Sequence, residues 1–387
     1  MAWTVVRDAL LLLALASFAY YVVAIVAALR FFRRRDAASL LADFTPPISI
    51  LKPIYGLDRE TYQNYAAFCA QDYPQYEILF CVSDDEDPAI PVIEQIARDF
   101  PDCHIKLLIG SEPLGVSDKV NKLCRMACEA EHEILAVSDS DVRVEPGYLR
   151  AIAAPFHDPA VGAVTCLYRG LTDGSLAANL EAIGNSTDFT AGVLVAWLFA
   201  PVNFTLGATM ATTKKCLAEI GGFESLVDHF SDDYELGNRI AARGHRVELS
   251  TFPVSIVYPH QTLADAFRHQ LRWNVSIRFS RPAGHLGLIF TQALPLALLA
   301  AIFAPSAAWA ISVLMGYLLL RGVSAWVVGV YGMRDAGVRK HLELLPLRDA
   351  FAFVVWLASF FPQRIHWRGR EFYVRDKRLV PTAPREQ

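Results

Sequence analysis

The chain has 387 residues, of which 53% are hydrophobic and 20% charged, and its formal net charge at pH 7 is -4. This composition is too apolar for an ordinary soluble enzyme, and it predicts a protein that is partly membrane and partly globular. The small net charge, without a basic stripe, excludes a nucleic-acid partner. The seven cysteines show no CxxC spacing, so we expect free thiols rather than disulfides or a zinc site.

An uncharged apolar run from Ala9 to Leu29 lies near the start of the chain and is about as long as a helix that crosses a bilayer. It is followed by Arg33, Arg34 and Arg35 rather than by a small-residue cleavage site, which favours an anchor over a signal peptide. By the positive-inside rule these arginines place the following residues in the cytosol.

Between residues 46 and 284 short apolar runs alternate with longer amphipathic ones, bounded by Pro, Gly and Asp. This pattern predicts an α/β domain with a mostly parallel sheet. In such a sheet the ligand site lies beyond the carboxyl ends of the strands. Two of the predicted strands end in acidic clusters, "SDDEDP" from Ser83 and "SDSD" from Ser138.

After residue 284 the chain becomes membrane-like again, with "LGLIFTQALPLALLAAIF" and "AAWAISVLMGYLLL", which we predict to form a hairpin of two spans. The loop after the hairpin is basic, as expected on the cytosolic side, and contains Arg334, Arg339, Lys340 and Arg348. Residues 350–362 are short for a span, so we predict a re-entrant or interfacial segment followed by a basic cytosolic tail.

The predicted organisation has three parts. Residues 1–45 form a transmembrane anchor and basic linker, residues 46–284 a cytosolic catalytic domain, and residues 285–387 the hairpin, the short apolar segment and the tail. We therefore expect an integral membrane protein with its α/β domain in the cytosol.

The apolar stretch "ILAV" runs into two aspartates, Asp139 and Asp141, one residue apart. Carboxylates this close repel each other unless a cation neutralises them, and hard oxygen ligands suit Mg²⁺ or Mn²⁺, which also binds diphosphate oxygens. The alternative for an isolated DxD is an Asx turn that ends a strand. The chain has no Walker A stretch and no GxGxxG, which disfavours a nucleoside triphosphatase or a Rossmann dehydrogenase.

Two further motifs accompany the DxD. Asp232 and Asp233 open an amphipathic helix in "SDDYELG". Simple N-capping would need only one of the two carboxylates, and we assign the cap to Asp232. A basic amphipathic helix then runs from Thr262 to Arg278, just before the hairpin. An ordinary surface helix would show the same pattern, but its position favours an interfacial helix beside the bilayer.

In this order the motifs resemble the ceramide glucosyltransferase family, family 21, a membrane branch of the family-2-type inverting glycosyltransferases that includes bacterial hopanoid-associated lipid glycosyltransferases. The resemblance runs from "ISILKPIYGLD" through "SDSDVRV" and "SDDYELG" to "IHWRGREFYV" and covers nearly the whole chain. It implies a nucleotide-sugar-binding, GT-A-like fold. It also implies that a hexose moves from a UDP-sugar to the hydroxyl of a membrane lipid, either ceramide or a hopanoid.

The same resemblance implies roles for individual residues. Asp139 and Asp141 hold the metal on the diphosphate, and Asp233 is the catalytic base. Arg272 and Trp273 match the end of the motif written Q/R-x-x-R-W. These roles agree with the chemistry, because a single inverting displacement needs a carboxylate base, and the departing diphosphate needs a metal and a cation such as Arg272.

Nucleotide-sugar contacts are also predicted. The resemblance implies that Asp84 lies beside the uridine. His269 stands where the motif has Gln or Arg, and Gln270 follows it, so this sequence departs from the family pattern at that position. Lys52 and Lys119 are further candidates, although surface lysines are usually only solvated.

Two other functions remain open from the residues alone. A processive polysaccharide synthase shares the DxD and RW motifs but generally has more spans, which form a polymer channel. A haloacid-dehalogenase-type phosphatase would use Asp139 as nucleophile and Asp141 as acid, but that family has the motif on its first strand, and here several predicted strands precede it.

Overall fold

The structure, a computed structural model, describes residues 2–34, 44–361, 364–367, 370–375 and 378–381. The chain forms two compact units. The helical unit consists of Met1–Arg33, Arg169–Ala200 and His260–Pro362. The sheet unit consists of Arg34–Tyr168, Pro201–Pro259 and Gln363–Gln387. The predicted domain boundary at residue 284 thus falls inside the helical unit. Where the chain enters and leaves a membrane stays a prediction.

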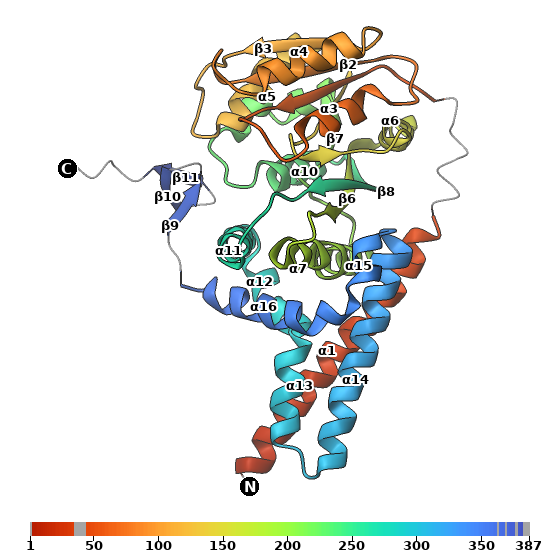
Figure 1. Cartoon of the computed structure of the whole chain (residues 1–387), viewed down its shortest axis with the longest axis vertical. Coiled ribbons are helices and arrows are strands. Elements are labelled where there is room, and N and C mark those ends of the chain that lie inside the picture. The colour runs from red at the N-terminus through yellow and green to blue at the C-terminus, as the bar shows by residue number, and fades with distance from the viewer. Residues whose placement is uncertain (1, 35–43, 362–363, 368–369, 376–377, 382–387) are drawn as a thin grey trace, which may run out of the picture. The chain divides into compact units, whose positions relative to one another are not determined.

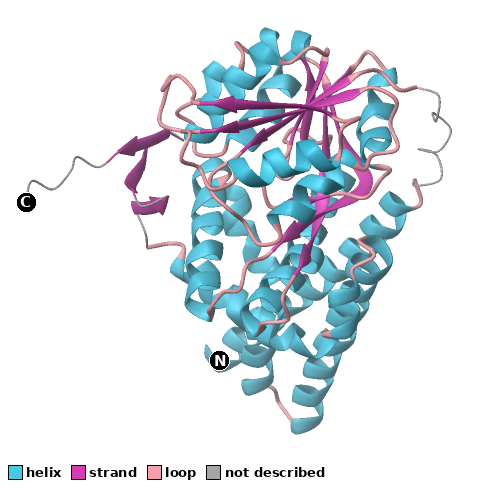
Figure 2. Cartoon of the chain, turned by 45° about the horizontal axis from the view of Figure 1, so that its top comes forward, coloured by secondary structure: helices cyan, strands magenta, loops and turns pink. Residues whose placement is uncertain are grey.

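A twisted eight-stranded sheet, with strands in the order β3-β2-β1-β4-β7-β6-β8-β5, forms the centre of the sheet unit (Figure 2). Its strands are β1 (Ile48–Pro53), β2 (Tyr76–Val82), β3 (His104–Ile109), β4 (Ile134–Val137), β5 (Val142–Arg143), β6 (Val161–Leu171), β7 (Met210–Thr213) and β8 (Arg246–Val257). Strand β1 pairs in parallel with β2 and β4, and β2 with β3. The antiparallel strands β7 and β6 then extend the sheet from β4.

The central parallel strands β1 and β4 are buried along their whole length because helices cover both faces. Every residue of β1 and β4 is buried. The register pairs Pro53 with Cys81 and Leu51 with Val137, so the loops that follow β1, β2 and β4 leave from the same edge of the sheet. The predicted α/β class is confirmed, and the two acidic loops lie at that edge.

Helices pack on the sheet within the same unit: α3 (Thr61–Cys69), α4 (Ile90–Asp99), α5 (Asp118–Glu129), α6 (Tyr148–Ala153), η2 (Ala154–His157), α9 (Lys214–Glu219), η4 (Phe223–Leu226) and α10 (Asp232–Ala242). The prediction that Asp232 caps α10 is wrong, because the N-cap residue is Ser231 and Asp232 is already the first helical residue.

In the basic tail, β9 (Arg364–Trp367), β10 (Arg370–Arg375) and β11 (Arg378–Pro381) form a small antiparallel sheet.

The helical unit contains α1 (Ala2–Phe32), α7 (Leu176–Gly184), η3 (Asn185–Phe189), α8 (Thr190–Phe199), α11 (Leu263–Ser280), α12 (Pro282–Gly287), η5 (Leu288–Thr291), α13 (Ala293–Ile302), α14 (Ala307–Ala325), η6 (Trp326–Gly332), α15 (Ala336–Lys340), η7 (Leu342–Leu344) and α16 (Leu345–Ala358). Segments η3 and η6 are π-helical, whereas η5 and η7 are 3₁₀ turns. Helices α1, α13 and α14 run side by side (Figure 1).

Two helices of the described chain are long and apolar enough to cross a membrane, Thr4–Phe32 and Ala307–Gly332. The predicted middle span is a pair of helices, Pro282–Thr291 and Ala293–Ile302, bent by 52°, which counts as a third span only if the pair is taken together. Helix α16 has 14 residues, in keeping with the short predicted segment. Arg348, predicted in a basic cytosolic loop, instead lies in helix α16, where its side chain is buried.

Gly237 allows α10 to pack closely against the loop before β7. A Cβ atom at this position would overlap the backbone of Phe204 and Thr205. Because backbone cannot rotate away as a side chain can, the helix or the loop would have to shift.

We therefore expect Gly237→Ala to lower the free energy of unfolding by about 1–3 kcal/mol, despite the better helix propensity of alanine. Thermal unfolding of the purified protein in detergent measures the change. Gly322→Ala is the matched control, because Gly322 lies inside α14 with open space where its Cβ would be. Equal melting temperatures for the two variants would contradict this packing role.

Candidate functional site

A lysine joins three elements at the carboxyl edge of the parallel strands. The Nζ atom of Lys119, in the first turn of α5, lies 2.9 Å from Asp139 Oδ1 after β4 and 3.2 Å from Asp232 Oδ2 in α10. Burial by itself would lower the pKa of Lys119, but the carboxylates of Asp139 and Asp232 raise it above its ordinary value. Lys119 therefore stays charged and holds the two acidic segments together.

Asp233 is oriented by main-chain groups. Its Oδ2 accepts a hydrogen bond from the Gly207 amide at 3.1 Å, and its Oδ1 accepts one from the Tyr234 amide at 2.7 Å. The Thr205 hydroxyl donates to the Asp233 carbonyl at 2.6 Å. Burial, and then the neighbouring Asp232 carboxylate, raises the pKa of Asp233 to about 6. The result is a fixed carboxylate that holds a proton more tightly than an ordinary aspartate.

Gly207 also shows that Asp139 and Asp233 border the same space. A Cβ built on Gly207 would lie 3.4 Å from Asp139 Oδ2 and 3.5 Å from Asp233 Oδ2. Only a glycine leaves that space open to a ligand. No spacing rule singled out Gly207 in the sequence, because the contact exists only once the β7 loop meets α10.

Asp141 is half-buried beside Asp139. Burial, followed by the charges of Asp139 and Asp58, raises the pKa of Asp141 to about 7. The Val257 amide of β8 donates to the Asp141 carbonyl at 2.9 Å and so fixes its backbone. When a carboxylate is partly buried beside other carboxylates, a nearby cation stabilises its charged form.

Lys52 lies beneath the DxD loop rather than at an open position. Its Nζ donates to the Asp139 carbonyl at 2.9 Å and lies 3.9 Å from the centre of the Phe68 ring. The side chain is fully buried, and this burial lowers the pKa of Lys52 to about 7. We therefore assign Lys52 to the support of the loop rather than to direct contact with a nucleotide.

The charges of the site fit a divalent cation. Four carboxylates, those of Asp139, Asp141, Asp232 and Asp233, accompany two ammonium groups, those of Lys52 and Lys119. The formal sum is four negative and two positive charges, which leaves two negative charges. Oxygen ligands with that surplus suit Mg²⁺ or Mn²⁺, with Asp139 and Asp141 as the residues that would hold it.

Asp84 lies in the exposed loop after β2, at the same edge of the sheet. Its Oδ1 accepts from the Glu86 amide at 3.1 Å, which is an Asx turn. In the same loop Asp87 is buried and accepts from the Gly56 amide at 3.0 Å and the Ala89 amide at 2.9 Å. Asp87 thus ties this loop to the one after β1, which holds Asp84 at the edge of the sheet.

The remaining predicted residues lie on α11, in the helical unit. His269 Nδ1 lies 2.5 Å from Glu181 Oε1, and its ring centre lies 4.9 Å from that of Trp273. Gln270 is buried, and its side-chain oxygen accepts from Arg348 at 2.6 Å. Their part in binding a nucleotide sugar, like that of Arg272, stays a prediction.

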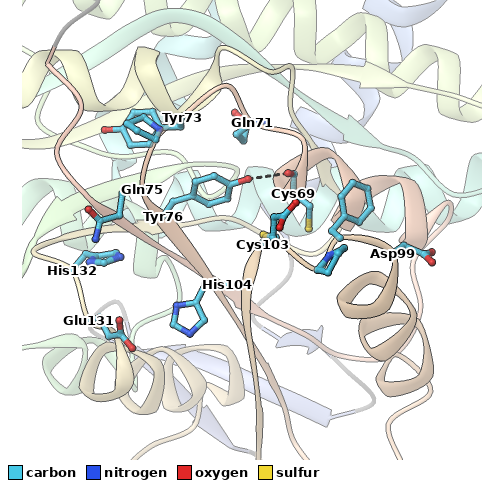
Figure 3. A pocket seen from close by; sticks show the side chains of 14 residues that line it. Cys69, Gln71, Tyr73, Gln75, Tyr76, Asp99, Cys103, His104, Glu131 and His132 are labelled. Carbon is cyan, nitrogen blue, oxygen red and sulfur yellow. Dashed lines mark hydrogen bonds between the residues drawn. The ribbon is translucent and has the colours of Figure 1, made fainter.

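A different pocket lies at the opposite, amino ends of β2 and β3. It is a cavity of about 530 Å³, lined among others by Cys69, Tyr76, Cys103 and His104 (Figure 3). Beside it, Glu77, His104 and Glu131 have the spacing of metal ligands, the only such group among the described residues. The Lys106 Nζ already lies 3.0 Å from Glu77 Oε2 and 2.6 Å from Glu131 Oε1, so an ammonium group supplies the positive charge there.

Comparison with known families tests the phosphatase alternative. The sequence model of glycosyl transferase family 21 matches residues 9–380. The chain belongs to glycosyl transferase family 21. The resemblance inferred from the motifs is therefore confirmed, and the phosphatase alternative is excluded.

Relatives of this family 21 chain include Ceramide glucosyltransferase 1 of Caenorhabditis elegans, 29% identical over 230 residues, which are 59% of this chain and 49% of that protein. The ceramide glucosyltransferase of Gibberella zeae is 32% identical over 141 residues, covering 33% of this chain and 27% of that protein. The match thus spans about half the length of the first relative and less of the second.

Among solved structures, the mannosyltransferase PcManGT from Pyrobaculum calidifontis, determined with GDP-Man and Mn²⁺, is 17% identical with a TM-score of 0.49. The structural match covers 90% of this family 21 chain and 99% of the PcManGT chain.

Gly207→Ala should weaken cation binding without unfolding the protein. The added methyl group would fill the space in front of Asp139 and Asp233 at ordinary contact distances. We expect Mn²⁺ affinity to fall about tenfold or more, that is by about 1.4 kcal/mol, which titration calorimetry measures.

The control for this variant is Gly287→Ala, which adds a methyl group in open space. Both variants should melt within about 2 °C of the parent protein, because neither addition overlaps other atoms. Unchanged Mn²⁺ affinity in Gly207→Ala would show that the cation lies elsewhere.

Proposed function

We propose that the protein is an inverting glycosyltransferase that moves a hexose from a UDP-sugar to the hydroxyl of a membrane lipid, ceramide or a hopanoid. Its family and its ceramide glucosyltransferase relatives support this reaction class. Apolar helices long enough to cross a bilayer support a lipid acceptor. The observation that carries the proposal is the cluster at the sheet edge, where Lys119 links Asp139 to the helix that begins with Asp232 and Asp233.

Asp139 and Asp141 are the residues proposed to hold Mg²⁺ or Mn²⁺. When bound, such a cation would offset the negative charge that develops on the departing diphosphate. Lys119 supplies a fixed positive charge beside Asp139, which favours the binding of an anionic donor. Asp84 is proposed to bind the uridine, at the same edge of the sheet.

Asp233 is proposed to be the catalytic base. Inversion in one displacement requires that a group remove the proton of the acceptor hydroxyl while the opposite face of the sugar loses its diphosphate. The hydrogen bonds from the amides of Gly207 and Tyr234 keep the carboxylate in one orientation. Its pKa of about 6 leaves it ionised at neutral pH but makes it a better proton acceptor than an ordinary aspartate.

Arg272 and Trp273 are proposed, from the motif alone, to stabilise the leaving group and the acceptor. The proposed location is a bacterial inner membrane with the sheet unit in the cytosol, as the arginines after α1 suggest. No nucleic acid takes part in this reaction.

The proposal is tested by supplying the protein in membranes with a panel of UDP-sugars and with ceramide and hopanoid acceptors. Mass spectrometry should find one hexose on one lipid. A polymer would instead indicate a processive polysaccharide synthase, and release of phosphate without transfer would contradict both.

Removal of the metal should abolish transfer. Asp139→Ala and Asp141→Ala each delete an oxygen ligand, and we expect transfer to fall by about 10² or more, with the same loss for the parent protein in excess chelator. Asp85→Asn, which changes an exposed acid in the loop after β2, is the control and should stay active. Full activity in chelator would rule out a metal-dependent mechanism.

Asp233→Asn should separate chemistry from binding. The amide keeps the shape of the side chain but accepts no proton, so we expect turnover to fall by about 10² to 10⁴ while UDP-sugar affinity changes little. Steady-state kinetics and calorimetry measure the two effects. Equal loss of affinity and turnover would make Asp233 a donor-binding residue instead.

The pH profile gives an independent test of the base. Because Asp233 must be ionised to act, and its pKa is raised to about 6, turnover should fall about tenfold per pH unit below pH 6. Asp232→Asn removes a negative neighbour that raises this pKa, so the acidic limb should move to lower pH. A limb that stays in place in Asp232→Asn would contradict the assignment of the base.

A further inference from the structure

A buried glutamate of α7 holds one side of α11. The side chain of Glu181 is fully buried, and its Oε1 lies 2.5 Å from His269 Nδ1. Its Oε2 accepts from the side-chain amide of Gln261 at 2.6 Å, just before α11 begins. The two oxygens of this carboxylate thus contact His269 and Gln261. Burying this carboxylate is therefore costly unless the histidine stays beside it.

A second acid, seven residues further along, holds a different side of the same helix. Asp188 in η3 accepts from Arg348 Nε at 3.1 Å, and Arg348 Nη1 donates to the Gln270 side-chain oxygen at 2.6 Å. Gly184 lies against this arginine, because a Cβ there would overlap its guanidinium group. Arg348 and Gln270 are both buried, so this link is shielded from water.

We call the contact of Glu181 with His269 the first anchor of α11, and the contacts of Arg348 with Asp188 and Gln270 the second anchor. The second anchor is held in turn by a residue of the candidate membrane helix α14. Arg321 of α14 is 2% exposed and lies 2.5 Å from Asp188 Oδ1 and 2.8 Å from Asp349 Oδ1. The Tyr317 hydroxyl donates to Asp349 at 2.9 Å. With Arg348, the group has two positive and two negative charges, so it is balanced inside an apolar bundle where an unpaired charge would be very unfavourable.

Together the two anchors restrict one motion. His269 and Gln270 are consecutive residues of α11, so their side chains leave the helix about 100° apart. Bonds in two such directions prevent rotation of the helix about its own axis. Trp273 lies one turn beyond His269, with ring centres 4.9 Å apart, so its direction follows that of the held histidine.

We propose that Glu181 and Asp188 are positioning residues that set the rotation of α11 and thereby aim Trp273 at the hydroxyl-bearing lipid acceptor. This inference rests on the proposed lipid glycosyltransferase function. The acceptor is the ligand at issue because α11 belongs to the same unit as the apolar helices α1 and α14, where a lipid would reside. The charges at Asp139, Asp141 and Asp233 belong to the other unit and should not be affected.

The test compares transfer with Mn²⁺ binding in the full-length protein. Glu181→Gln and Asp188→Asn should each lower transfer to ceramide or hopanoid about 10-fold to 100-fold, because a displacement of about 1 Å can cost that much. Mn²⁺ affinity by calorimetry should stay within about twofold of the parent protein, because Asp139 and Asp141 lie in the other unit. A loss of transfer together with a loss of Mn²⁺ affinity would indicate general damage and overturn the proposal.

Two matched comparisons separate positioning from folding. Asp173→Asn removes the acid of another histidine pair in the same unit, with His260 at 2.6 Å, and should leave transfer unchanged. At Arg348, the variant Arg348→Lys keeps a positive charge and a donor beside Asp188 and Gln270 and should retain more transfer than Arg348→Leu. Equal activity of the two Arg348 variants would contradict the second anchor, even if an acid variant failed to fold.

A spectroscopic measurement keeps the inference testable if no acceptor is found. In protein labelled with 5-fluorotryptophan, Trp273→Phe identifies the ¹⁹F resonance of Trp273. This resonance should shift or broaden in Glu181→Gln and Asp188→Asn but not in Asp173→Asn. An unmoved resonance would overturn the proposed control of α11, whereas absence of transfer with every donor and acceptor would overturn only the proposed function.

Discussion

The ion pairs of Lys119 are the interaction on which the sheet-edge site depends. One ammonium group meets Asp139 after β4 and Asp232 in α10, two segments far apart in the chain. Without it the carboxylates would repel one another and α10 would not be held against the DxD loop. Pairs that are largely removed from water act more through geometry than through net stability, because desolvation offsets most of their attraction.

That geometry explains why Asp233 has different partners and a different proposed role from its neighbour Asp232. Asp232 forms an ion pair with Lys119, whereas Asp233 accepts hydrogen bonds from the amides of Gly207 and Tyr234. Adjacent acids therefore carry separate tasks, one structural and one proposed to be chemical. The raised pKa of Asp233 follows from its burial and from the charge retained on its neighbour.

The two units divide the proposed reaction into a donor side and an acceptor side. The sheet unit contains the charges suited to a diphosphate and a cation. The helical unit contains the apolar helices and a balanced group of charges around Arg321, which is buried in a candidate span. Such a group is costly to bury unless every charge is paired, and here its pairs lead to α11.

Local patterns in the sequence were enough to predict the α/β class, the apolar helices and the acids at the strand ends. Hydrophobic periodicity and strand-end residues are properties of short segments, so they are readable without tertiary contacts. They also indicated Asp139, Asp141 and Asp233 and the family to which the chain belongs.

Only the tertiary structure decided which side chains meet. It showed that Lys52 is buried beneath the loop, that Gln270 binds Arg348, and that Gly207 borders the space beside Asp139 and Asp233. It also continued the parallel strands with the antiparallel strand β7, whose four residues, Met210–Thr213, have no local feature that indicates their direction. These contacts join residues many positions apart, and no spacing rule encodes them, because they arise only when separate elements pack.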